Sequence, residues 1–401
     1  MDQEKRLSDF LIYRSKIGNG VTRPNIPFII KELLDKDEKN SQLQEESKIK
    51  IFKDNLPDKS WVHRFISRHP NVLARTPDHN VHMKKQVTET LLIDWFQNLE
   101  DFLLEEHDLS AKDFLTKENS HRIFHLGETG FLLCGTNVLE VNTSKGPKND
   151  SNIGAESQDQ ITVLGCVSGA GEFQKPFVMF PGISQMINFQ NVNPEKYNVG
   201  NSLNGMISDD SFFTWFVDIF FQVIRNKVVF PIIVFMDGLS SRINMAFYEF
   251  FRKNNIILYC FPLHNSHSIQ PLDICVYEPL KNHWKSQLTN YHGTSVNYIN
   301  KDNFFTVFDE AWEAAKKMPD NVKSSFCNAG IIPFDANALD YSRLVDEKLP
   351  SEKVQTQQQQ ENVSIECKLG VTMALMAFER CLSAENLELF KKIIFWPSVF
   401  S

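Results

Sequence analysis

The sequence lacks the features that mark several specialised classes of protein. None of its seven cysteines lies in a C-x-x-C pair, so the spacing typical of zinc sites and redox motifs is missing. Its longest uninterrupted apolar run, residues 228–236, is about half the length that a membrane-spanning helix needs. The first twenty residues are rich in charge and hold no secretory apolar segment. These absences favour an intracellular protein with reduced thiols and no membrane partner.

Excess positive charge is also absent from the chain as a whole. The 401 residues carry a formal net charge of −8, which argues against a protein that coats nucleic acid along its whole surface. The distribution is uneven, because residues 1–85 contain 17 Lys and Arg against 12 Asp and Glu. We therefore expect a small basic head, which suits an anionic partner, followed by a larger acidic body.

The basic head reads as a series of helices over residues 5–75. In its last helix, which begins near Pro57 and ends at Pro70, Trp61 and Phe65 recur at helical spacing and are expected in the core. The opposite face presents basic side chains, with one more beyond the helix: Lys59, His63, Arg64, Arg68 and Arg75. This arrangement is typical of a helix-turn-helix module that binds DNA. The alternative is a solvated basic face on an ordinary helical subdomain.

After a helical connector, the pattern from about residue 120 changes to that of an α/β domain. Strands are expected at 121–126, 131–141, 160–167 and 172–180, the last two forming a hairpin around Gly169–Gly171. The apolar run 228–236 predicts a central strand, and 256–261 a second buried strand. Helices are expected at 211–225, at 242–253 and from 272 onward, so the domain has three layers.

Two aspartates stand where an α/β sheet collects functional groups. Asp237 directly follows the central strand, and Asp273 lies 36 positions later in the first turn of a helix. Together they could share a hard cation such as Mg²⁺, although each could equally be a cap or turn residue. Two-metal phosphoryl transfer also needs a carboxylate from the first strand. There the chain has Gly127, and the neighbouring Glu128 should point to the other face of the strand.

Several ordered blocks resemble the pogo/Tigger/jerky group of transposase-derived proteins, within the mariner-like DDE superfamily. SWVHRFISRH (60–69) is similar to the signature G-W-x-x-x-F-x-x-R-H of the centromere protein B-type DNA-binding domain. HLGETG (125–130) resembles N-x-D-E-T-G, and FMDGLSSR (235–242) resembles L-D-N-x-x-S-H. The closest block is PLHNSHSIQPLD (262–273), which resembles P-P-H-T-S-H-x-L-Q-P-L-D. SKG (144–146) and AGIIPF (329–334) match further family blocks.

The resemblance implies a DNA-binding head and a ribonuclease H-like catalytic fold, in which three carboxylates hold two Mg²⁺ ions. Asp237 and Asp273 correspond to the second and third carboxylates, whereas Gly127 stands at the first. Gly238 and Arg242 also depart from the family pattern, which has Asn and His there. Loss of one carboxylate predicts weak metal binding, if any, at Asp237 and Asp273 and a severe loss of cleavage.

We therefore predict five segments: a helix-turn-helix DNA-binding domain (1–80), a helical connector (81–119), a degenerate DDE domain (120–340), a Gln-rich linker (341–365) and a helical tail (366–401). The predicted fold class is an α-helical head followed by a mixed sheet flanked by helices. The predicted function is sequence-specific binding of double-stranded DNA in the nucleus, with no cofactor required and a homo-oligomer allowed. The alternative is an active, Mg²⁺-dependent DDE endonuclease in which Glu128 or a substrate group replaces the missing carboxylate. A third reading is an interaction scaffold that uses neither DNA nor metal.

Overall fold

The computed structural model describes residues 2–41, 52–72, 89–133, 160–182, 192–237, 243–262, 269–294, 299–339 and 341. Some predicted features lie outside these ranges: Arg75, segment 144–146, Gly238, Arg242, the histidines His264 and His267, the linker beyond Tyr341, and the tail 366–401. Within the described ranges, no helix combines the length and apolar character needed to cross a membrane.

Three helices build the N-terminal head, and their bounds are α1 (Asp2–Lys16), α2 (Ile26–Ser41) and α3 (Lys59–Arg68), with short 3₁₀ turns at Arg23–Asn25 and Lys53–Asn55. Apolar residues at helical spacing on each helix meet in a small core: Leu7, Leu11, Ile26, Ile30, Val62, Phe65 and Val72. Asp58 caps α3, because its Oδ1 accepts a hydrogen bond from the backbone N–H of Trp61 at 2.6 Å.

Helix α1 also belongs to the core of the body. Its second apolar face carries Phe10, Tyr13 and Ile17, which are buried with residues of the body. The Tyr13 ring lies 4.8 Å from that of Tyr248, and the backbone N–H of Cys260 donates to the carbonyl of Ile17 at 2.9 Å. The predicted boundary at residue 80 stays a prediction, but α1 is shared by both cores.

The body is built on one six-stranded mixed sheet, whose order is β4-β3-β2-β1-β5-β6. The strands are β1 (Ile123–Leu132), β2 (Gln160–Ser168), β3 (Phe177–Pro181), β4 (Asn198–Ser202), β5 (Ile232–Asp237) and β6 (Ile256–Phe261). Strands β1, β2 and β3 form an antiparallel meander, while β5 and β6 run parallel to β1. This mixed sheet with flanking helices, preceded by a helical head, confirms the predicted fold class.

Two strand predictions were wrong in their bounds. The strand predicted at 121–126 does not end there, because β1 runs unbroken from Ile123 to Leu132 along an uninterrupted ladder with β2. Residues 134–141 of the strand predicted at 131–141 lie outside the described residues. Glycines 127 and 130 do not interrupt the strand, since both pair with residues of β2 in this ladder. The central strand starts at Ile232 rather than 228. Pro231 has no N–H to donate and therefore delimits the ladder.

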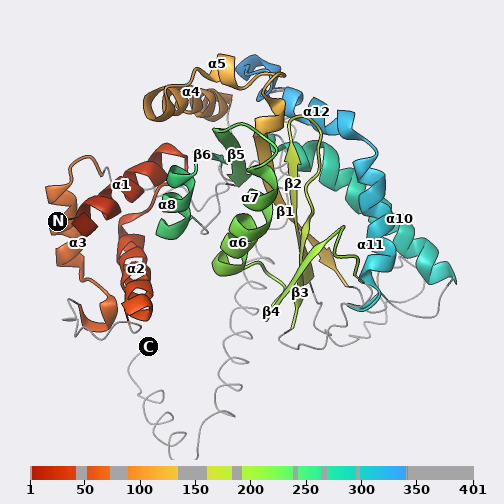
Figure 1. Ribbon diagram of the computed structural model, residues 1–401, viewed down its shortest axis with the longest axis horizontal. Coiled ribbons are helices and arrows are strands. Elements are labelled where there is room, and N and C mark those ends of the chain that lie inside the picture. Colours follow the sequence, from red (N-terminus) through yellow and green to blue (C-terminus); the bar gives the residue numbers. More distant parts are fainter. Residues whose placement is uncertain are drawn as a thin grey trace, which may run out of the picture. The chain divides into compact units, whose positions relative to one another are not determined.

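Helices cover both faces of the sheet (Figure 1). Phe124 of β1 contacts Phe220 at 5.3 Å, on the face covered by α6 (Asp209–Trp215), the π-helical η6 (Phe216–Phe220), α7 (Phe221–Ile224) and α8 (Met245–Lys253). Phe131 contacts Trp284 and Phe308 on the other face, which is covered by α4 (Glu89–His107), η7 (Asp273–Tyr277), α10 (Glu278–Thr294), α11 (Phe304–Lys316) and α12 (Pro319–Asn328). The short α5 (Ala111–Phe114) and the 3₁₀ turns Ser120–Arg122 and Ala336–Ala338 complete the described elements.

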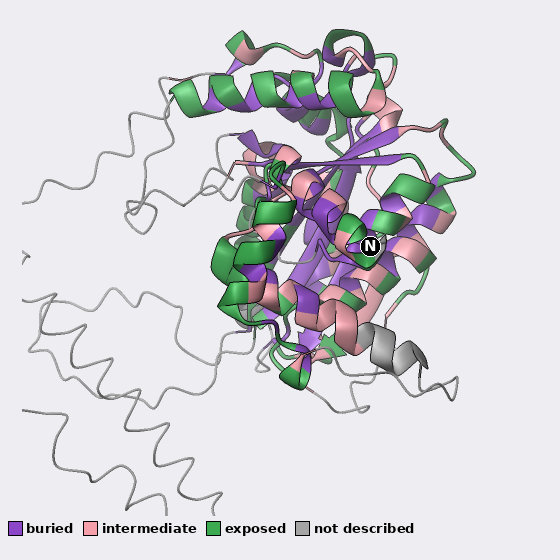
Figure 2. Cartoon of the chain, turned by 90° about the vertical axis from the view of Figure 1, so that its left-hand side faces the viewer, coloured by how far each residue is buried: buried purple, intermediate pink, exposed green. Residues whose placement is uncertain are grey.

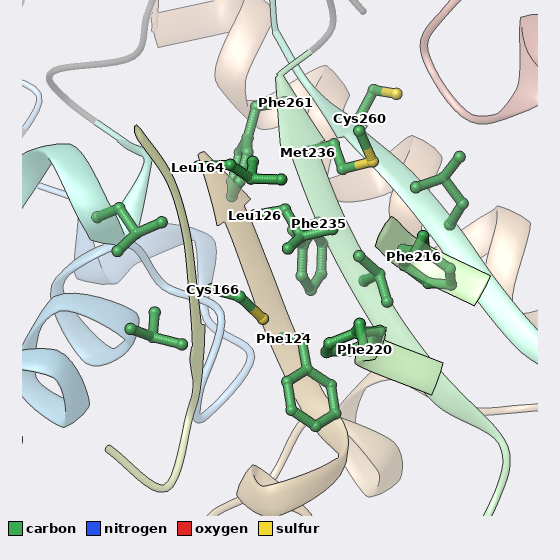
Figure 3. Packing of buried hydrophobic residues seen from close by; sticks show 14 of the residues in the cluster. Phe124, Leu126, Leu164, Cys166, Phe216, Phe220, Phe235, Met236, Cys260 and Phe261 are labelled. Carbon is green, nitrogen blue, oxygen red and sulfur yellow. The ribbon is translucent and has the colours of Figure 1, made fainter. Parts of the chain in front are cut away.

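The core lies where the two layers of helices meet the sheet. The helices expose their outer sides and bury the sides that face the strands (Figure 2). Aromatic and aliphatic side chains of the central strands interleave with those of the helices, as Phe124, Phe216, Phe220 and Phe235 illustrate (Figure 3). This packing fixes the strand ends, on which the candidate site depends.

Candidate functional site at the carboxyl end of the sheet

Asp237 is the last residue of the central strand β5. The five preceding residues of the strand are buried, whereas Asp237 is half-exposed at the end of the sheet. β5 pairs in parallel with β1, and the last pair in the ladder is His125 with Phe235. Continuing this register by two residues brings position 127 level with Asp237, on the same face of the sheet.

Gly127 is buried and faces the helix that carries Asp273. A Cβ built there would lie 3.1 Å from Cδ1 of Leu272 and 3.5 Å from Cε2 of Tyr277. The structure thus brings position 127, Asp237 and the start of η7 to one edge of the sheet. Because residue 127 of β1 is a glycine, this strand contributes no carboxylate to that edge.

Glu128 lies on the opposite face, as alternation along the strand predicted. Gly127 and Thr129 are buried, and Glu128 between them is exposed. Phe124 and Leu126, which share the face of Glu128, pack in the layer of Phe216 and Phe220 (Figure 3). Its carboxylate therefore projects from the wrong side of the strand to join Asp237.

Asp273 is the first residue of η7 and is half-exposed. Two hydrogen bonds hold its helix on β1: the backbone N–H of Leu272 donates to Nδ1 of His125 at 3.1 Å, and the hydroxyl of Tyr277 donates to the carbonyl of Gly127. The Tyr277 oxygen also accepts from the N–H of Gly165 at 3.1 Å. A Cβ at Gly165 would lie 2.6 Å from that oxygen, so only glycine permits this approach.

Burial dominates the electrostatics around this edge. His125 is completely buried, and desolvation lowers its pKa to about 3, so the ring is neutral at pH 7. Because Nδ1 accepts from Leu272, the proton resides on Nε2. Burial raises the pKa of the Cys260 thiol to about 12, and the charge of Asp237 adds to this shift.

The residues present do not fit the two-ion centre of an active DDE enzyme. Within the described ranges, no group of three His, Cys, Asp or Glu side chains could hold a metal ion. Asp237 and Asp273 are oxygen donors suited to Mg²⁺, but a two-ion centre needs ligands that bridge and surround both ions. His264 and His267 lie outside the described residues.

The sequence pattern missed His125, Gln270 and Tyr277 as parts of this edge. His125 shares a face of β1 with position 127, two residues away, which the strand period could have revealed. Gln270 is also buried and lies close enough to affect the protonation of His125. Nothing local in the sequence predicts the contact of Tyr277 with Gly127, which are 150 positions apart.

The predicted DNA-contacting residues lie on α3. Lys59, His63, Arg64 and Arg68 are exposed, as expected. Arg68 differs from the rest, because its guanidinium forms a two-pronged contact with Glu4 at 2.8 and 3.2 Å. Hydrogen bonding to Arg68 in turn lowers the pKa of the Glu4 carboxyl.

The two aromatic residues of α3 face the core side. Phe65 is fully buried, which confirms its predicted place in the core. Trp61 is only half-buried, and its ring stacks on that of Phe65 at 5.3 Å. Trp61 also lines a small cavity of about 180 Å³, together with residues of α1 and α2 and with Met245 of α8.

Comparisons with known proteins support the catalytic-domain part of this description. Residues 158–326 match the family described as DDE superfamily endonuclease. A curated relative, the "MFS-type transporter clz9" of Cochliobolus lunatus, is 27% identical over 220 residues, which are 54% of this chain and 24% of the relative. The chain thus spans about a quarter of that protein's length.

Solved structures of the Mos1 transposase are also similar. The "Mos1 mariner paired end complex with Mn" is 12% identical with a TM-score of 0.31, over 75% of this chain and 78% of that one. The "Mos1 transposase paired-end complex with left transposon end" is 10% identical with a TM-score of 0.29, over 79% and 100% of the two chains. Asp237 and Asp273 both lie in the segment that matches the DDE superfamily endonuclease family, residues 158–326.

Proposed function

We propose that this chain is a transposase-derived protein of the pogo/Tigger type that binds duplex DNA in the nucleus and no longer cuts it. The observation that carries the proposal is Gly127, which is level with Asp237 on the face toward Asp273 and offers no ligand. The centromere protein B-type character of the head and a homo-oligomeric state belong to the same proposal.

The chemistry of strand cleavage explains why one missing carboxylate matters. In-line displacement at phosphorus needs both the attacking and the leaving oxygen to be stabilised, which two-metal sites achieve by clamping each with one ion. When bound, Mg²⁺ supplies this charge stabilisation. Asp237 and Asp273 would hold it, but two carboxylates make a sparse site that binds one ion weakly.

The head supplies the DNA-binding part of the proposal. α3 carries exposed cations on one side and core residues on the other, as a recognition helix requires. Neutralising phosphates releases counterions, so binding through these residues should weaken steeply with salt.

The test uses the full chain, because α1 contributes to both cores. Purified protein should retain a random-sequence duplex at low salt and lose it as salt rises. It should not nick supercoiled plasmid with Mg²⁺ or Mn²⁺ present. Cleavage that disappears in Asp237→Ala would establish the alternative, an active endonuclease. If the protein retained the duplex equally at all salt concentrations, or did not retain it at all, DNA binding would be contradicted.

Gly127→Asp tests the geometric basis of the proposal. It should give Mn²⁺-dependent thermal stabilisation that the wild type and the uncharged, equally sized Gly127→Asn lack. The new Cβ would lie 3.1 Å from the flexible end of Leu272, which has to shift by a few tenths of an ångström, and 3.4 Å from Cε1 of His125. A Gly127→Asp protein that responds to Mn²⁺ no better than Gly127→Asn would mean that the three positions do not converge on a metal.

A further inference from the structure

A solvent-open groove of about 750 Å³ runs between the start of α2 and α3. Its floor is apolar and includes Pro24, Phe28, Leu56 and Ile66. Phe28 is 62% exposed and Leu56 41% exposed, so two large apolar side chains of the head are open to solvent in the same groove.

The rim of this groove is positively charged. Arg23, Lys59 and His63 line it and are all exposed. Within the described part of the chain, no acidic side chain pairs with them, in contrast to Arg68 and its partner Glu4. The one acid of the groove, Asp58, is engaged in capping α3.

The apolar floor and the basic rim of this protein groove together complement the chemical groups that duplex DNA presents on its major-groove side. Phosphates would meet the cations, and the thymine methyl groups are the apolar features that the major groove displays. An acidic, apolar peptide would match the same charges. However, the exposed cations continue past the rim of the groove to Arg64, which follows His63 on the adjoining side of the same helical turn. This suits a strand of phosphates better than a peptide confined to the groove.

We propose that this groove receives duplex DNA, with Arg23 and Lys59 on phosphates and Phe28 and Leu56 against thymine methyl groups. The inference rests on the proposed DNA binding and assigns its contacts. It adds Arg23 and Phe28, which precede α3 by more than thirty positions and belong to no basic run. It also makes the head selective for thymine, because phosphate contacts alone carry no sequence information.

The test begins with a duplex that the full wild-type chain selects from a random pool. This duplex is synthesised once with thymine and once with deoxyuridine, which lacks only the methyl group. Phe28→Ala is compared with Leu203→Ala, a change at an exposed apolar residue of the body, and Arg23→Ala with Arg225→Ala, a change at an exposed arginine of the body.

The wild type should bind the deoxyuridine duplex about fourfold more weakly for each methyl group it contacts. Phe28→Ala should discriminate between the two duplexes about fourfold less than the wild type for each methyl group that Phe28 contacts, whereas Leu203→Ala should discriminate as the wild type does. Arg23→Ala should lower the slope of log K against log salt by about 0.9, while Arg225→Ala should leave it unchanged.

Three results would overturn the groove assignment. If the wild type binds duplex with a steep salt dependence while Arg23→Ala and Phe28→Ala behave like their controls, the groove is wrong but the DNA-binding proposal stands. If an acidic apolar peptide binds the wild type and these two variants lose the peptide but retain the duplex, the occupant is a protein. If the wild type retains no duplex at any salt concentration, the proposed function itself fails.

Discussion

The carboxyl end of the sheet and the surface of the head arrange their polar groups in opposite ways. At the sheet end, the hydroxyl of Tyr277 and the imidazole of His125 turn inward and bond to backbone groups. In the head, Arg23, Lys59 and His63 turn outward and meet no acid among the described residues. The comparison teaches that the body holds the Tyr277 hydroxyl and Nδ1 of His125 in internal hydrogen bonds around Gly127, while the head keeps charge available for a partner. Even there, Nε2 of His125 and Nε2 of Gln270 are buried without a hydrogen-bond partner among the described residues.

The largest expected effect concerns the core on which the exposed charges depend. Phe65→Ala should cost about 3–5 kcal/mol of stability, because a fully buried ring leaves a cavity in a small core. Trp61→Ala should cost less, since its side chain is only half-buried. Chemical denaturation of the full chain measures both. A larger loss for Trp61→Ala would show that the stack on Phe65, rather than burial, holds the head together.

The next effect tests the inward-turned histidine. Its folded pKa of about 3 lies below the ordinary 6.5, so between these values the unfolded chain binds the extra proton and stability falls as pH falls. From pH 7 to 5 this linkage amounts to about 2 kcal/mol. His125→Asn keeps an acceptor for the N–H of Leu272 but does not titrate. Between pH 7 and 5 its free energy of unfolding should therefore fall by about 2 kcal/mol less than that of the wild type. Equal pH dependence in the two proteins would mean that the imidazole is charged when folded.

Removing the Tyr277 hydroxyl should have a smaller effect. Tyr277→Phe keeps the ring but leaves Gly127 and Gly165 without their side-chain partner, at a cost of about 1.5 kcal/mol. The matched control is Tyr341→Phe, whose hydroxyl bonds to a carbonyl at the edge of the body. If both variants lose the same small amount, the contact at Gly127 is no more important than a surface hydrogen bond.

The smallest effect should come from Arg68, the cation of α3 that pairs with Glu4. Arg68→Ala should lower stability by less than about 1 kcal/mol, since the pair with Glu4 is half-exposed. It should leave the salt slope of DNA binding nearly unchanged, whereas Lys59→Ala lowers it by about one. If Arg68→Ala lowered the salt slope by a full unit, the guanidinium would have to leave Glu4 and bind a phosphate. Arg68 would then behave like the cations of the head that meet no acid among the described residues.

The sequence was informative where the structural signal is local. Alternation along β1 correctly separated the faces of Gly127 and Glu128, and the apolar run before Asp237 correctly predicted a central strand. It failed where the local signal is weak: β4 has the sequence NVGNS, whose Asn and Gly residues are rare in strands, and it was not predicted. Helices α11 and α12 were also missed, although Phe304, Phe308 and Ala311 recur at helical spacing.

The sequence by itself determined the periodicities, the position of each aspartate at the end of an element, and the absence of a carboxylate at residue 127. These depend on neighbouring residues, because strand and helix periods fix which side chains share a face. Only the tertiary structure decided that the Tyr277 hydroxyl binds the carbonyl of Gly127 and that Arg68 forms an ion pair with Glu4. It also decided that Arg23, Phe28 and Lys59 line one groove. Such pairs are far apart in the chain and meet only because the packed elements bring them together, which no local pattern encodes.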